Sequence, residues 1–322
     1  MANHDENHSH QTHPYHLVNP SPWPALASLA LFITVFGGAM YMHQRTGGVF
    51  LLATGFAVVL YTMYVWWRDV IHESRVDNAH TKAVSQGLRL GMLLFITSEV
   101  LFFAAFFWAF FDSSTLPRAP LEDVWGIAEG TWPPKGIKPF DPFHLPLLNT
   151  LILLLSGTTV TWAHYSILQN KQKDTVTALW YTVILGIIFS SCQAYEYTHA
   201  SFGFKDGVYA SNFYMATGFH GFHVIVGTIF LAICLGRAKK GHFLPEKHLG
   251  FEFAAWYWHF VDVVWLFLFI FIYCDVATII LPAFQTIFTG TNILIGFALS
   301  AAATVFFGAK NFGKASQKNS NH

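Results

Sequence analysis

The sequence predicts an all-α protein that crosses a membrane several times, and two properties of the chain lead to that prediction. Of its 322 residues, 53% are hydrophobic and only 11% are charged, whereas soluble domains carry about 25% charged residues. The apolar residues gather in runs of about 20, the length that a helix needs to cross the hydrocarbon core of a bilayer. Acidic and basic residues are equal in number, 18 of each, which argues against nucleic acid as a partner.

Eight apolar runs are candidates for these helices. The first seven runs predict transmembrane helices, and the eighth run is a further candidate. The eight runs are residues 25–43, 49–67, 90–111, 145–168, 175–197, 212–235, 251–274 and 291–309. The chain is therefore expected to hold a polar tail (1–22), a transmembrane domain (23–281) and a C-terminal extension (282–322). The composition of the tail is typical of a mobile segment. Its five histidines could also bind a metal weakly: His4, His8, His10, His13 and His16.

Basic residues in the connecting segments predict the orientation of the chain. If the N-terminus lies inside, the inner segments before the C-terminal tail hold ten lysine and arginine residues and the outer segments hold five. Cytoplasmic segments of membrane proteins carry the excess of such residues. We therefore expect the N-terminus to be cytoplasmic.

A single carboxyl, Glu99, lies deep within the third run. It is about 13 Å from the start of that run at the helical rise, and its helical neighbours are apolar, namely Phe95, Ile96, Phe102 and Phe103. Such surroundings favour the neutral acid. A carboxyl near the midplane costs roughly 3 kcal/mol on insertion scales, so it indicates a functional group. The alternative is a neutral acid that only forms hydrogen bonds between helices.

Other polar residues are expected at a similar depth. His220 and His223 are three residues apart in the sixth run, and His259 and Asp262 are three residues apart in the seventh. Polar groups inside a membrane usually pair with one another. Together with Glu99 they predict either a hydrogen-bond network that holds helices together or a relay for protons.

Redox centres are not expected in this chain. Haem ligation uses paired axial residues, often histidine, on facing helices. Each deep histidine of this chain could instead pair with a nearby carboxyl. A dinuclear copper site would need clustered cysteine and histidine, and the cysteines lie far apart: Cys192, Cys234 and Cys274. The sequence therefore predicts no metal ligand and no catalytic residue.

Several long stretches resemble one known family. FITSEVLFFAAFFWAFF, TGFHGFHVIVGTIFL, WWRDVIHES and AAWYWHFVDVVWLFLF are similar to subunit III of haem–copper cytochrome c oxidase, and the resemblance covers roughly residues 14–273. It implies seven helices in two bundles, the first two splayed from the other five around a V-shaped cleft that holds phospholipids. It also implies that haem a and copper belong to partner subunits and that this chain carries no redox centre.

The resemblance implies a supporting role in an oxidase of the aa3 type. Such a complex oxidises cytochrome c, reduces oxygen to water and translocates protons. This chain would pack with subunits I and II, stabilise the catalytic subunit through bound lipid and help proton uptake. The expected location is a bacterial inner membrane, with the mitochondrial inner membrane as the alternative. Two other functions stay open, subunit III of a quinol oxidase and an independent proton-coupled transporter that uses Glu99 and Asp262.

The resemblance also implies roles for individual residues. Glu99 matches the carbodiimide-reactive carboxyl of the family, and Arg237 matches an arginine that contacts a lipid phosphate. Five further residues match positions that contact lipid: Trp66, Trp67, Glu73, His80 and Phe95. Ordinary anchoring at the level of the headgroups, where indoles settle, would also explain the two tryptophans.

The eighth run leads to a testable prediction, because chains of this family usually end soon after the seventh helix. Residues 291–309 carry no charge and would form a helix of about 28 Å. An eighth span puts 13 basic residues inside against 5 outside, whereas seven spans give 10 against 8. A phosphatase that is active only outside should therefore be silent when fused after Lys318. Activity there would show an interfacial or disordered tail instead of a span.

Overall fold

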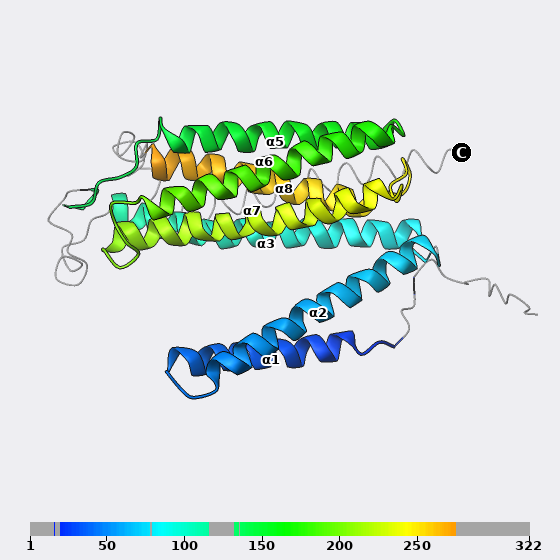
Figure 1. The fold of residues 1–322 in the computed structure, drawn as a ribbon, viewed down its shortest axis with the longest axis horizontal. Helices are drawn as coiled ribbons and strands as arrows, with labels where there is room; N and C mark the ends of the chain where they lie inside the picture. The colour runs from blue at the N-terminus through cyan, green and yellow to red at the C-terminus, as the bar shows by residue number, and fades with distance from the viewer. Residues whose placement is uncertain (1–15, 17–19, 78, 116–131, 135, 275–322) are drawn as a thin grey trace, which may run out of the picture. The chain divides into compact units, whose positions relative to one another are not determined.

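The computed structural model describes residues 16, 20–77, 79–115, 132–134 and 136–274, and its regular elements are helices (Figure 1). Seven are long and apolar enough to cross a membrane: α1 (Trp23–Met42), α2 (Gly48–Arg75), α3 (Lys82–Thr115), α5 (Leu145–Leu168), α6 (Gln172–Thr198), α7 (Val208–Lys239) and α8 (Leu249–Leu268). A π-helical turn, η2 (Phe269–Tyr273), continues α8. The prediction of an all-α fold with seven such helices is confirmed. The candidate eighth helix lies outside the described residues.

Several helices continue beyond the apolar runs that predicted them. α2 extends eight residues past position 67 through polar sequence, because neither proline nor glycine interrupts it there. α7 ends at Lys239, and Gly241 follows with a φ of +67°, a conformation that glycine adopts without steric cost. The apolar runs therefore mark the thickness of the membrane, whereas the breaking and capping residues decide where each helix ends.

The described chain divides into two units, Met1–Leu90 and Gly91–His322. In the first unit, α1 and α2 form a hairpin whose helices lie side by side (Figure 1). Gly55 allows their close approach, since an added Cβ there would lie 2.6 Å from the backbone nitrogen of Thr34. At the open end of the hairpin, the indole N–H of Trp23 donates a hydrogen bond of 2.8 Å to Asp69.

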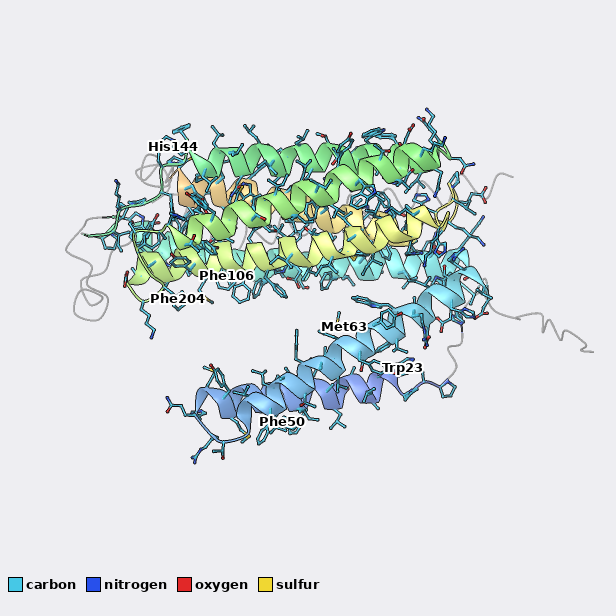
Figure 2. The ribbon with its side chains drawn as sticks, in the orientation of Figure 1. Trp23, Phe50, Met63, Phe106, His144 and Phe204 are labelled. Carbon is cyan, nitrogen blue, oxygen red and sulfur yellow. The ribbon has the colours of Figure 1, made fainter. Side chains whose placement is uncertain are left out.

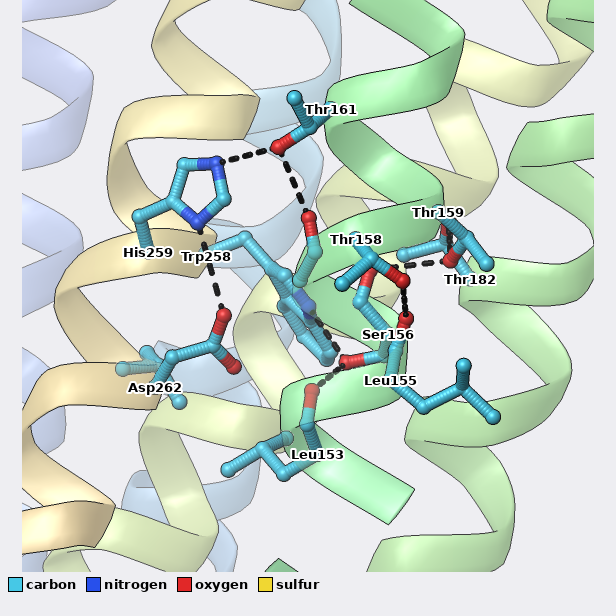
Figure 3. Close-up of polar contacts among 12 residues, drawn as sticks. Leu153, Leu155, Ser156, Thr158, Thr159, Thr161, Thr182, Trp258, His259 and Asp262 are labelled. Carbon is cyan, nitrogen blue, oxygen red and sulfur yellow. Dashed lines mark hydrogen bonds and ion pairs between the residues drawn. The ribbon is translucent and has the colours of Figure 1, made fainter. Parts of the chain in front are cut away.

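The second unit packs its helices around α8, the most buried of the seven. Trp258 is completely buried, and its indole N–H donates a 2.9 Å hydrogen bond to Ser156 on α5 (Figure 3). Gly186 on α6 and Gly227 on α7 make room for the ring, because an added Cβ at either would lie 2.9 Å from a ring carbon. One side chain of α8 therefore contacts three other helices.

Trp265 repeats this arrangement seven residues later along α8. It is also fully buried, and its indole N–H donates to the hydroxyl of Thr150 on α5 at 2.9 Å. Positions seven apart lie on nearly the same face of a helix. The two indoles thus fix both the rotation of α8 about its axis and its position along that axis relative to α5.

Large apolar side chains are exposed on the outside of both units. Figure 2 labels Phe50 and Met63 on α2, and their exposed fractions are 71% and 38%. Phe204, which precedes α7, is 51% exposed. Apolar surface of this extent is unusual on soluble monomers and indicates contact with lipid or with other subunits.

The space around Trp258 leads to a prediction for Gly227→Ala. The new methyl group would meet the indole at 2.9 Å, and overpacking of this kind costs about 1–3 kcal/mol. We expect a lower melting temperature of the protein in mild detergent. Gly221→Ala on the same helix is the matched control, because an added Cβ there meets nothing within 4 Å. Equal melting temperatures for the two variants would contradict the close packing.

Candidate functional site

The carboxyl of Glu99 on α3 pairs with the imidazole of His223 on α7. Oε2 of Glu99 lies 2.9 Å from Nε2 of His223, and the side chains are only 22% and 9% exposed. Aromatic rings surround the histidine, with Phe103 at 5.1 Å and Tyr257 at 6.2 Å between centroids. The sequence placed these two residues at one depth, and the structure brings them into contact.

The hydrogen-bond pattern of His223 determines where this pair can carry protons. Its Nδ1 lies 2.6 Å from the carbonyl oxygen of Phe219, and a carbonyl only accepts, so Nδ1 carries a hydrogen. Nε2 then either accepts a proton from neutral Glu99 or donates one to its carboxylate. The pair therefore shares one proton, which lies either on the carboxyl oxygen or on Nε2.

A second pair, His259 and Asp262, lies on α8. Figure 3 shows the His259 ring between Thr161 and Asp262, with Nδ1 at 3.5 Å from the carboxyl and Nε2 at 3.2 Å from the Thr161 hydroxyl. Thr161 donates its own hydrogen to the carbonyl of Gly157, so its oxygen accepts from Nε2–H. As with Glu99 and His223, one proton is left to be shared between the imidazole and the carboxyl.

His220 belongs to neither pair. It is almost completely buried, and its Nε2–H donates to the carbonyl of Val261 at 3.1 Å. Its ring packs against Trp265, with 5.1 Å between centroids. Within the described residues, no hydrogen bond connects the Glu99–His223 pair with the His259–Asp262 pair. The predicted polar residues therefore form two separate pairs and one packing histidine.

The residues expected to contact lipid in the first unit lie in the last three turns of α2 and just beyond it. Trp66 and Trp67 are 38% and 55% exposed, whereas Glu73 and His80 are half-buried and stand close to His16. Partial burial lowers the pKa of His80; the proximity of His16 lowers it further, and Glu73 acts in the opposite direction. His80 is therefore expected to be neutral at pH 7.

Two more of these residues belong to the second unit. Phe95 on α3 is 46% exposed, and its ring stacks near that of Tyr257 at 6.4 Å. The guanidinium of Arg237, in the last turn of α7, lies 4.7 Å from the ring centroid of Phe243. Phe95 is therefore open to an apolar ligand, and Arg237 places its guanidinium beside an aromatic ring at the end of its helix.

Comparison with known proteins identifies the family. The family described as cytochrome c oxidase subunit III matches residues 13–276 of this chain. The chain belongs to the cytochrome c oxidase subunit III family. A probable cytochrome c oxidase subunit 3 of Rickettsia bellii is 59% identical over 272 residues, which is 83% of this chain and 98% of the relative. The subunit 3 proteins of Prototheca wickerhamii and Arabidopsis thaliana are each 57% identical, over 81% and 82% of this chain and 97% of each relative.

Membership of the subunit III family confirms the main functional prediction. The chain is a multi-pass subunit of the cytochrome c oxidase complex, which is an oxidoreductase. Subunits I and II are the partners that membership implies. The subunit III family carries no redox centre itself. The independent transporter that the sequence left open is thereby disfavoured.

One buried carboxyl was missed by the sequence reasoning. Glu196 near the end of α6 is almost fully buried, and it accepts hydrogen bonds from the Tyr273 hydroxyl at 2.6 Å and from Gln193 at 3.2 Å. Its other oxygen has no hydrogen-bond partner among the described residues. Its position at the end of an apolar run suggests an exposed interfacial acid. The tyrosine hydroxyl comes from η2, 77 residues away, so only the fold reveals the contact.

The Glu99–His223 geometry leads to a prediction for the wild-type subunit and for Glu99→Gln. The neutral acid should react with a hydrophobic carbodiimide that dissolves in the bilayer, and mass spectrometry should locate the adduct on Glu99. Glu99→Gln should abolish the adduct, yet the complex should assemble, because the amide still donates to Nε2 of His223. Faster modification by a water-soluble carbodiimide than by the hydrophobic one would contradict the buried placement.

Proposed function

We propose that this chain supports the catalytic subunit of an aa3-type oxidase by binding phospholipid and by assisting proton uptake, with cytochrome c as the electron donor. The observation that carries the proton role is the contact between Glu99 and His223. A pair that shares one proton can pass it from one member to the other without changing the net charge between the helices. The names of the relatives, which are cytochrome c oxidase subunits, support cytochrome c over quinol as the donor.

The lipid role is supported by side chains at the ends of the helices. Trp66 and Trp67 expose indole surface in the last turns of α2, where a headgroup and an acyl chain meet. The guanidinium of Arg237 has the planar donor geometry that binds phosphate through two hydrogen bonds. The remaining contact positions, Glu73, His80 and Phe95, fit this proposal because each is partly exposed.

The proposed location is a bacterial inner membrane with a cytoplasmic N-terminus. The excess of basic residues in alternate connections supports this orientation. The relatives come from Rickettsia bellii as well as from Prototheca wickerhamii and Arabidopsis thaliana. The mitochondrial inner membrane is therefore the alternative location.

The lipid role predicts the behaviour of Arg237→Ala. A hydrogen bond to a charged group is worth about 1.5–3 kcal/mol, so the variant complex should retain less phospholipid after purification. Its initial turnover should equal that of the wild type, but it should inactivate after fewer turnovers. Lipid mass spectrometry and prolonged assays measure the two effects.

Lys240→Ala is the matched control for this experiment. It removes the same charge from the same end of α7, at an exposed residue, and should leave lipid content and lifetime unchanged. Unaltered lipid in Arg237→Ala, or an equal loss in both variants, would rule out a specific phosphate contact.

A further inference from the structure

Three potential metal ligands from separate segments meet in the first unit. His16 precedes α1, Glu73 lies in the last turn of α2, and His80 precedes α3. One ligand atom from each residue lies within 4.8 Å of the corresponding atoms of the others, and all three residues are half-buried. The sequence assigned His16 to a tail and the other two to lipid, so the fold alone brings them together.

Local hydrogen bonds hold the start of α1 and the residue before His80 against α2. Trp23 donates to Asp69 at 2.8 Å, which fixes the start of α1 against α2 one turn before Glu73. The N–H of Ala79 donates to the carbonyl of Glu73 at 3.0 Å, and this contact folds the chain back toward the end of α2. The rings of His16 and His80 then lie 6.2 Å apart between centroids, at 57° to each other.

The chemistry of the three side chains fits zinc better than the hard cations. Zn²⁺ accepts histidine nitrogen and carboxylate oxygen at about 2.0–2.2 Å, and sites with three protein ligands complete the tetrahedron with water. Calcium and magnesium prefer oxygen ligands throughout. Tetrahedral bonds of that length put ligand atoms about 3.4 Å apart. Small rotations of the half-buried side chains, which move each ligand atom by about 1 Å, would therefore close the site.

We propose that His16, Glu73 and His80 bind one zinc ion, with water as the fourth ligand. At Glu73 and His80 the ion would take the place of the lipid contact proposed above, and it would tie His16 to the end of α2 and to the start of α3. The ion would connect the three segments that carry these ligands. The carboxylate offsets part of its charge, and the two imidazoles supply neutral donors.

The test uses the intact oxidase complex, washed with a chelator and titrated with zinc against a fluorescent zinc indicator. All variants carry His4, His8, His10 and His13 replaced by glutamine, so that the other tail histidines do not contribute. In that background His16→Gln, Glu73→Gln and His80→Gln should each weaken one zinc site. In metal sites, loss of a residue that only hydrogen-bonds to a ligand lowers metal affinity by about 10–100-fold. Loss of a ligand itself should therefore lower zinc affinity by at least about 100-fold.

His72→Gln is the matched control, because His72 is exposed and adjoins Glu73 on the same helix. It should keep the affinity of the background. Equal zinc affinity in the background and in His16→Gln or His80→Gln would overturn the proposal, as would an equal loss in His72→Gln.

A second measurement uses the wild-type complex, so it does not depend on whether the variants assemble. Zinc should protect His16 and His80 from diethyl pyrocarbonate, as read by peptide mass spectrometry, whereas His72 should react equally with and without zinc. Absence of protection at His16 and His80 would also overturn the proposal.

Discussion

The second unit depends on the fit of one indole among three neighbouring helices. A bilayer offers little hydrophobic gain when two apolar helices meet, so association relies on close packing and on buried hydrogen bonds. Trp258 supplies both, because Gly186 and Gly227 leave room for its ring and Ser156 accepts its N–H. Trp265 adds the same type of bond to α5 one heptad later.

The surroundings of both polar pairs depend on that fit, because the residues on either side of Trp258 contribute to them. Tyr257 precedes it and stacks near the ring of His223, while His259 follows it and pairs with Asp262. Fixing the rotation of α8 around Trp258 therefore sets the aromatic wall of the first pair and the contact of the second pair with Thr161 on α5. A change in that rotation would disturb both contacts at once.

The two pairs share a chemical logic although no hydrogen bond connects them in the described part of the chain. In each, one nitrogen of the imidazole is committed to a backbone carbonyl or to a threonine hydroxyl, and the other faces a carboxyl. The committed nitrogen fixes the tautomer, so the shared proton lies on a defined side of the ring.

The sequence by itself determined the fold class, the seven helices and the family. Run length and charge placement respond directly to the bilayer, which is why they can be read from the chain. The tertiary structure decided which polar groups meet: Glu99 contacts His223, 124 residues away, and His16 joins Glu73 and His80. It also revealed that Glu196 is buried and accepts a hydrogen bond from the hydroxyl of Tyr273, which is 77 residues away. Depth is a property of one helix, but pairing depends on how helices rotate and pack against one another, and residues far apart in sequence set that jointly.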